Sequence, residues 1–475
     1  MGIPQSSYWT PAARPGCNTL PCRTHGAPGR STTWLQYIAL SHPWGTGPHF
    51  CTLPSNLVNH KHGIAVDSLP STFKDAVIVT RRLGIAYLWI DSICIVQGPE
   101  GDFDTEADRM EYYFGNAWCV IVASSATSQT DGFLNARTKQ RDFVTIERSY
   151  KGRPRFHVCE FIDDFQKDVV EGPLSQRGWV FQERALARRS IFFSEGQTYW
   201  ECGHGVRCET MTKTSNLLAS YMGDPNFPSR LADGVTRLEI IQGYESLYSR
   251  YSRLGLSRET DRPVAIRGLQ KRLIRSLGVP GPFGVFDDRR SYLQHTLLWR
   301  RGRDFGSMAR IPGLIGSVPS WSWMAYRGGI DYLDLPPGGE VAWKAGQVEA
   351  PWRHDELDLK ATLNVGTTPR DMELRAVARP FSSGFSGGSG SGRRLEIIYD
   401  NPSACAWDHS KLRCVAMGRE NVRGKAEGDI THYVLMVQLT EGLCTNDIYE
   451  RVGSGYVDGC FIDWAESAMC WVTIR

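Results

Sequence analysis

A carboxylate inside an apolar run is the first candidate for chemistry. Asp91 interrupts the apolar segment 87–96, and a carboxylate there is costly to bury unless a partner compensates its charge. The sequence leaves two readings of this residue open. Asp91 is either part of a ligand pocket, or it holds a neighbouring loop or pairs with Arg177 or Arg184.

A second acid, Glu106, occupies the first turns of the helix expected after that segment. Its carboxylate has either a catalytic or a structural role. An acid near a helix N-terminus is also favourable by about 0.3–1 kcal/mol through the helix dipole, without any catalytic role. Helical spacing places Glu106 on the same side as Met110 and Tyr113. The structural role of Glu106 needs fewer assumptions, and the sequence leaves both roles open.

A third group of polar residues is concentrated on the segment 177–189, which we expect to be a short helix. Spacing of i, i+4 and i+7 places Trp179, Glu183 and Leu186 on one face. A buried Glu183 needs a cationic partner, and Arg184 or Arg189 could donate two hydrogen bonds to it. The group is read first as a structural ion-pair network and second as a site for a substrate anion or a protein partner. Its candidate residues are Arg177, Trp179, Gln182, Glu183, Arg184 and Arg189.

The elements that must position these residues alternate between strand and helix. The apolar segments 37–41, 87–96 and 118–124 are typical of buried parallel strands. Helices are expected between them, and this alternation predicts an α/β fold with an open, doubly wound parallel sheet. Ligands bind beyond the carboxyl ends of such strands. The pocket expected near Asp91 therefore also includes Ser41, Trp44 and Gly45.

Two helices are expected between the strands. The first begins at residues 71–72, where Asp75 completes a capping box, and Gly84 ends it. The second opens at residues 102–104 and continues to Gly115, with one apolar stripe along its length.

The rest of the chain divides by composition. Residues 1–33 are rich in Pro, Gly, Ser and Thr and predict a flexible arm, and the α/β domain is expected over 34–210. A mainly helical segment over 211–310 and a β-rich region over 311–475 follow. A flexible Gly/Ser linker is expected at 381–392.

The overall composition argues against several classes of protein. The 475 residues carry 54 Lys and Arg against 51 Asp and Glu, a formal net charge of +3. Basic residues occur in pairs and not on the concentrated face that nucleic acids need, so no nucleic-acid partner is expected. No apolar stretch approaches the ~20 residues of a membrane span. The 13 cysteines show no disulfide framework, so we expect a reducing, cytoplasmic location.

Neither a metal nor an organic cofactor is expected to be required. Cys202, His204 and Cys208 form only part of a zinc-binding pattern, and no second pair of ligands completes it. The glycine-rich patterns of nucleotide-binding loops and the nucleophile elbow of serine hydrolases are also missing from the sequence.

Three motif blocks, taken in order, resemble the fungal heterokaryon incompatibility (HET) domain. They are YIALSHPWG at 37–45, LWIDSICIVQ at 88–97 with its continuation through Glu106 to 117, and the block 173–189. The likeness extends over most of the chain from about residue 37, and its diagnostic part is roughly the first 150 residues of that stretch. The family-motif candidates outside the third block are Ser41, Trp44, Gly45, Trp89 and Gln97.

The resemblance implies a protein of fungal allorecognition. In vegetative incompatibility, a form of innate immunity, such proteins are effectors that trigger programmed cell death. The HET domain is also similar to the Toll/interleukin-receptor (TIR) fold, a flavodoxin-like open parallel sheet, and some proteins with that fold cleave NAD. By that likeness Glu106 and Asp91 would be catalytic groups and NAD a candidate substrate. The alternatives are another small-molecule enzyme, or a non-catalytic module that signals with a sensor protein or by self-assembly.

Overall fold

The chain divides into two compact units in the computed structural model. The first consists of Met1–Phe227 with Val264–Leu269, and the second of Pro228–Pro263 with Gln270–Arg475. Both expected C-terminal regions, the helical and the β-rich one, contribute to the second unit. The structure describes residues 8–9, 36–135, 143–146, 156–159, 163–209, 211–214, 216, 222, 236–336, 340–352, 373–381, 393–402, 411–440 and 447–475.

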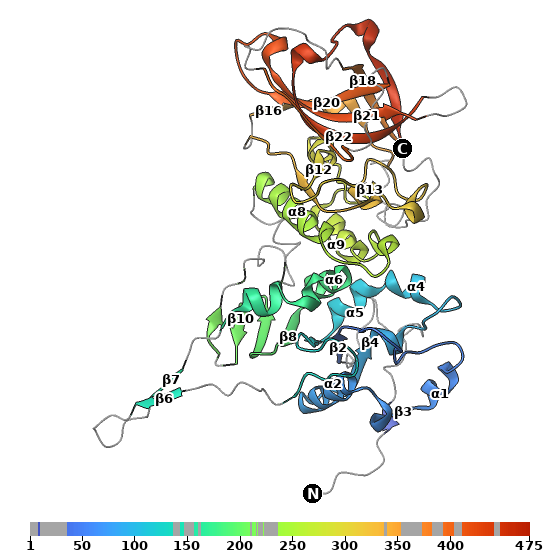
Figure 1. Cartoon of the computed structure of the whole chain (residues 1–475), viewed down its shortest axis with the longest axis vertical. Coiled ribbons are helices and arrows are strands. Elements are labelled where there is room, and N and C mark those ends of the chain that lie inside the picture. Colours follow the sequence, from blue (N-terminus) through green and yellow to red (C-terminus); the bar gives the residue numbers. More distant parts are fainter. Residues whose placement is uncertain are drawn as a thin grey trace, which may run out of the picture. The chain divides into compact units, whose positions relative to one another are not determined.

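A mixed seven-stranded sheet lies at the centre of the first unit, in the order β11-β10-β9-β8-β5-β2-β4 (Figure 1). Four neighbouring strands run parallel: β4 (Tyr87–Ile90), β2 (Tyr37–Ser41), β5 (Cys119–Val122) and β8 (Arg189–Phe193). Three antiparallel strands extend the sheet: β9 (Thr198–Cys202), β10 (Gly205–Cys208) and β11 (Lys213–Thr214). The expected α/β architecture is confirmed, but the sheet is parallel only in part.

Helices cover both faces of the parallel strands (Figure 1). On one face, α2 (Ser71–Arg82) contributes a buried apolar stripe to the core beneath β2, β4 and β5. On the other face, Trp89 of β4 packs against Tyr113 and Phe114 of α5 (Met110–Asn116), with ring centroids 4.9 and 5.5 Å apart. Burial on both faces explains why these strands are apolar throughout instead of alternating with polar residues.

The strand expected over 87–96 ends at Ile90. Its partner β2 pairs with it only as far as Leu40 with Ile90, and the later part of the segment forms only an isolated bridge, between Val96 and Thr52. Asp91 instead begins the single-turn helix α3 (Asp91–Cys94). The prediction that Asp91 lies within a strand is therefore wrong, and the residue stands just past the carboxyl end of β4.

The helix expected to continue from residues 102–104 to Gly115 is also two helices, α4 (Phe103–Ala107) and α5. Asp102 precedes α4 but its side chain does not cap it. Its carboxylate accepts the backbone N–H of Val96 at 2.7 Å and so holds the turn after α3.

The capping box expected at the start of α2 is likewise wrong. The helix follows Pro70 without a side-chain cap. The Asp75 carboxylate accepts the backbone N–H groups of Phe133 and Leu134 at 2.6 and 2.9 Å, which come from a loop 58 residues further along the chain. The expected end of the helix is confirmed, because Gly84 adopts a φ of +73° there.

Smaller elements complete the first unit. The helix expected over 177–189 is α6 (Gly178–Leu186). The expected arm lies outside the described residues except for Tyr8–Trp9, which pair as β1 with Ile64–Ala65. The other elements are α1 (Leu57–His62), β3 (Ile64–Ala65), β6 (Phe143–Ile146) and β7 (Phe156–Cys159).

The second unit begins with helices and short strand pairs around a core of large aromatic residues. Trp299, Trp321 and Trp323 are fully buried in it. Its helices are α8 (Arg237–Ser252), most of α9 (Arg267–Leu277) and α10 (Tyr292–Leu297). The short strands pair as β12 (Trp299–Arg301) with β15 (Ile330–Tyr332), and β13 (Ala309–Arg310) with β14 (Tyr326–Arg327).

The expected β-rich region forms an eight-stranded sheet in the order β16-β20-β21-β22-β23-β18-β17, with β19 paired to β22. β18 also pairs with β20, so the sheet returns on itself. The strands are β16 (Val341–Trp343), β17 (Val348–Glu349), β18 (Leu374–Pro380), β19 (Leu395–Tyr399), β20 (Leu412–Glu420), β21 (Thr431–Leu439), β22 (Ile448–Asp458) and β23 (Cys470–Ile474). Apart from Phe381, the expected linker lies outside the described residues. In the part of the chain that is described, no helix has the length and hydropathy to cross a bilayer.

Candidate functional site

Polar side chains meet where β2 and β4 end. The Asp91 carboxylate accepts the indole N–H of Trp44 at 3.0 Å and the backbone N–H of Ser92 at 2.7 Å. Its side chain is 23% exposed, so one side of it reaches the surface. Asp91 therefore both holds the loop after β2, as one reading of the sequence expected, and stands at the sheet edge where ligands of open α/β sheets bind.

His42 is the buried member of this group and was not among the residues singled out from the sequence. Its side chain is 1% exposed, and its Nδ1 lies 3.7 Å from Asp91 Oδ1, too far for a hydrogen bond. Among the described residues, neither ring nitrogen has a hydrogen-bond partner. Burial lowers the pKa of His42 to about 4, although the nearby Asp91 opposes that shift. The ring is therefore neutral at physiological pH. Its place directly after the strand end was the one signal available in the sequence.

Glu183 approaches the same group from α6 and is buried, with 7% of its surface exposed. Burial and the charge of Asp91 raise its pKa to about 7, while the neighbouring Ser41 hydroxyl and Arg177 favour the charged form. The Arg177 guanidinium also donates to the His42 carbonyl at 3.0 Å. We call Ser41, His42, Trp44, Asp91, Arg177 and Glu183 the strand-end cluster. It places the Asp91 carboxylate near Glu183, whose pKa is raised toward neutrality, and acids with perturbed pKa values are typical of acid–base sites.

The ion pairs expected for Glu183 are not formed. Arg184 makes two hydrogen bonds to Glu201 of β9, at 2.8 and 2.9 Å, and both side chains are almost fully buried. Arg189 donates to the Trp118 carbonyl at 3.0 Å and its guanidinium lies over that ring. Successive residues of α6 point in different directions, so Glu183 and Arg184 cannot face one partner. The expected ion-pair network does hold α6 on the sheet, but through Glu201.

Glu106 makes structural contacts. Its carboxylate accepts hydrogen bonds from Arg109, at 3.0 Å, and from the Tyr113 hydroxyl. Tyr113 in turn stacks on Trp89. The expected position of Glu106 on the Tyr113 side of the helix is confirmed. These contacts join α4 to α5 and to the sheet, so they account for Glu106 without a catalytic role.

The other candidates from the sequence serve local packing. Trp179 packs edge to face against Phe103, with ring centroids 5.7 Å apart. The Gln182 side-chain carbonyl accepts the backbone N–H groups of Gly268 and Leu269 at 2.7 and 3.3 Å, and both of these residues belong to the first unit. The Gln97 amide donates to the Ile95 carbonyl at 3.1 Å.

Gly45 allows the loop that carries Trp44 to pass close to a second loop. Its φ is +82°, and a Cβ there would lie 2.6 Å from Ser128 Cβ. We expect Gly45→Ala to lower the free energy of unfolding of the first unit by about 2–4 kcal/mol, the sum of backbone strain and overpacking. Gly84→Ala is the matched control, because Gly84 has a φ of +73° and open space around it. It should cost about 1 kcal/mol. Urea denaturation followed by hydrogen exchange measures both, and equal losses would contradict the predicted clash.

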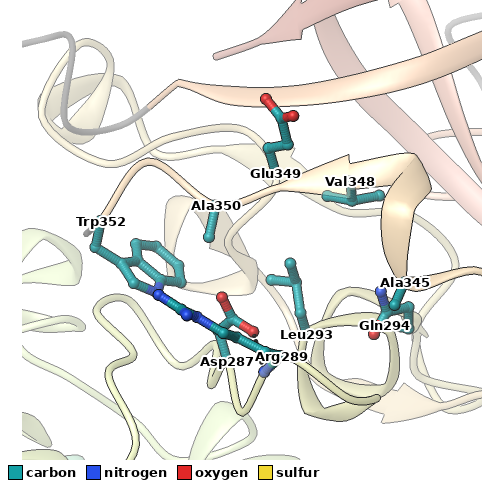
Figure 2. Close-up of a pocket in the computed structure, with 9 residues that line it drawn as sticks. All are labelled: Asp287, Arg289, Leu293, Gln294, Ala345, Val348, Glu349, Ala350 and Trp352. Carbon is teal, nitrogen blue, oxygen red and sulfur yellow. Dashed lines mark hydrogen bonds between the residues drawn. The ribbon is translucent and has the colours of Figure 1, made fainter. Parts of the chain in front are cut away.

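The second unit contains a separate cavity of about 260 Å³. Figure 2 shows Trp352 and Ala345 on opposite sides of it. Arg289, which also lines it, has a φ of +58° and is held by a hydrogen bond from its backbone N–H to Asp287 at 2.8 Å. Among the residues with described positions, no three His, Cys, Asp or Glu side chains gather as metal ligands.

Every member of the strand-end cluster lies within residues that match a protein-family model. Residues 37–183 match the family model described as "Heterokaryon incompatibility protein (HET)". The comparisons with curated proteins and with solved structures found no match. The matched residues include β2, β4, β5 and most of α6, which position the cluster. The chain therefore carries a heterokaryon incompatibility (HET) domain over residues 37–183.

Proposed function

We propose that this chain is a fungal heterokaryon incompatibility protein that acts in the cytoplasm as an effector of programmed cell death. The observation that supports this most is the HET match over 37–183, because it contains each member of the strand-end cluster. A sensor protein that recognises the foreign partner, or self-assembly of the chain, would supply the trigger.

Inducible expression of the full chain in a filamentous fungus tests this proposal. Induction should cause loss of viability, and Asp91→Asn should abolish it because the variant removes a charged member of the cluster. Glu106→Gln is the matched control. It also neutralises a carboxylate of the HET domain, but one whose contacts are with Arg109 and Tyr113. At equal protein abundance, killing by Asp91→Asn or loss of killing by Glu106→Gln would contradict the assignment to the cluster.

A second candidate is hydrolysis of NAD at the strand-end cluster. Two observations favour it. The four parallel strands have the spatial order second, first, third, fourth, which is the start of the flavodoxin-like order. Glu183 also has a pKa of about 7 beside Asp91, which suits a general base at neutral pH. Asp91 and Glu183 are therefore better candidates for catalysis than Glu106.

The proposed reaction uses the two carboxylates in different roles. The bond between the ribose C1 and the nicotinamide nitrogen breaks, and its electron pair stays with nicotinamide. Asp91 stabilises the positive charge that develops on the ribose. Water forms the new C–O bond and gives up a proton to the Glu183 carboxylate. The products are nicotinamide, ADP-ribose and one proton.

Nicotinamide release from NAD by the purified full chain separates the enzyme from a non-catalytic module. Turnover that Asp91→Asn abolishes supports the enzyme. If an assembled form of the chain kills cells but releases no nicotinamide, the effector proposal stands and the NAD proposal fails.

A further inference from the structure

A second cavity of the second unit, of about 240 Å³, is lined by a buried arginine. Leu254, Leu256 and Phe305 form much of its apolar wall. Arg262 is 7% exposed at the same wall. Its guanidinium donates to the Gly328 carbonyl at 3.2 Å, the one hydrogen bond it makes among the described residues. The cavity therefore combines apolar surface with a cation that is poorly compensated.

The other buried arginines among the described residues are compensated differently. Arg184 pairs with Glu201 at 2.8 Å, Arg451 with Asp400 at 3.1 Å, and Arg300 has carboxylates within 4.0 Å. Such pairing is the rule, because an isolated buried charge is very costly. Within the described part of the chain, no carboxylate forms an ion pair with the Arg262 guanidinium. Burial accordingly lowers its pKa.

Arg262 and Arg327 share a single carboxylate of the cavity lining, which leaves one positive charge in excess at that side of the cavity. Arg253 also lines it, but its guanidinium pairs with Asp304 at 2.7 Å and with Asp331 at 2.8 Å. Arg327 pairs with Glu259. Glu259 is thus the one carboxylate of the lining and is shared electrostatically between Arg327 and Arg262. Two guanidinium groups against one carboxylate suit a bound monoanion, and Glu259 would repel a dianion.

We propose that this cavity binds a small organic carboxylate, with Arg262 as its anchor. A guanidinium offers the planar pair of donors that a carboxylate accepts. The apolar wall would take the hydrocarbon part of the ligand. The volume of about 240 Å³ lies below that of drug-sized pockets, so the ligand has about the size of benzoate. This site is independent of the strand-end cluster and of the function proposed for it.

Ligand-observed NMR and thermal shift with the full chain test the proposal, using acetate, benzoate and phenylacetate as probes. Benzamide and phenylphosphonate are the matched controls, because they replace the carboxylate of benzoate with a neutral amide and a dianion. Benzoate should bind at least about tenfold more tightly than either control, which corresponds to the loss of one charge-assisted contact. Arg262→Met should abolish benzoate binding. Arg258→Met, which changes an exposed neighbouring arginine outside the cavity lining, should leave it unchanged.

A fourth variant keeps Arg262 in place. Leu256→Trp fills the cavity from its apolar wall and should weaken benzoate binding by about tenfold or more even if Arg262→Met fails to fold. The proposal is overturned if none of the three carboxylates binds, if benzamide binds as tightly as benzoate, or if Leu256→Trp binds benzoate as well as the wild-type chain does.

Discussion

Replacing Arg184 with methionine is expected to lower the free energy of unfolding of the first unit by about 3–5 kcal/mol, because it leaves the buried Glu201 carboxylate without its partner. The two side chains are 4% and 1% exposed. Besides Arg184, the Asn216 side-chain amide donates to Glu201 at 2.6 Å, and a neutral amide does not replace the lost charge. The Arg184 guanidinium also lies 5.3 Å from the ring centres of Phe165 and Phe192, so its loss removes packing as well.

Two further variants separate the ion pair from the packing. Arg188→Met is the matched control, because Arg188 is exposed just past the end of α6, and it should change stability by less than about 0.5 kcal/mol. The double variant Arg184→Met with Glu201→Met should recover most of the loss, since apolar side chains often replace a buried ion pair without cost. Hydrogen exchange of β8 and β9 under native conditions measures all three. If the double variant is as unstable as Arg184→Met alone, the loss of stability comes from packing and not from the ion pair.

Replacing Glu183 with glutamine is expected to stabilise the first unit above about pH 7 while it abolishes function. The usual pKa of a glutamic acid is 4.5, and in this fold it is raised to about 7. The folded protein therefore holds the proton more tightly than the unfolded chain does. The stability that this proton contributes is fully present below pH 4.5 and is lost as the pH rises through about 7. The shift corresponds to about 3 kcal/mol.

Glutamine has no proton to lose, so the difference in free energy between the variant and the wild type should rise by about 3 kcal/mol across that pH range. Hydrogen exchange of α6 and β2 as a function of pH measures this difference. Glu195→Gln, at an exposed position, is the control, and its difference from the wild type should stay flat. A flat difference for Glu183→Gln would mean that Glu183 is ionised in the folded protein.

The same variant tests catalysis. If Glu183 accepts a proton during NAD hydrolysis, Glu183→Gln should lower nicotinamide release by about 100-fold or more and abolish cell killing. Since the variant is expected to be more stable than the wild type near neutral pH, misfolding cannot explain that loss. Full activity with the expected gain in stability would remove Glu183 from the mechanism and leave it as a buried structural acid.

His42 should give a pH dependence of the opposite sign. Burial lowers its pKa from 6.5 to about 4, so the folded protein releases a proton that the unfolded chain would hold. The stability that the neutral ring contributes is present above pH 6.5 and is lost as the pH falls through about 4. The contributions of His42 and Glu183 therefore oppose each other in the wild type between pH 4.5 and 6.5, and Glu183→Gln leaves the His42 contribution alone.

The sequence predicted the order of the elements because periodicity is local. The apolar segments at 37–41 and 118–124 became β2 and β5, and the stripe of α2 is buried as expected. Local rules failed where a backbone N–H outside the expected helix was hydrogen-bonded to the same side chain. Asp75 and Asp102 both looked like helix caps, but they accept N–H groups from Phe133 and Val96.

The sequence by itself determined two things. One is the resemblance to the HET domain, and the other is that the residues after Ser41 lie close to Asp91. Parallel strands end at one edge of a sheet whatever the details of packing. Only the tertiary structure decided which groups pair and which hold a proton. Arg184 found Glu201 on an antiparallel strand that no local pattern links to it. Burial next to Asp91, which depends on distances in space, set the pKa of Glu183.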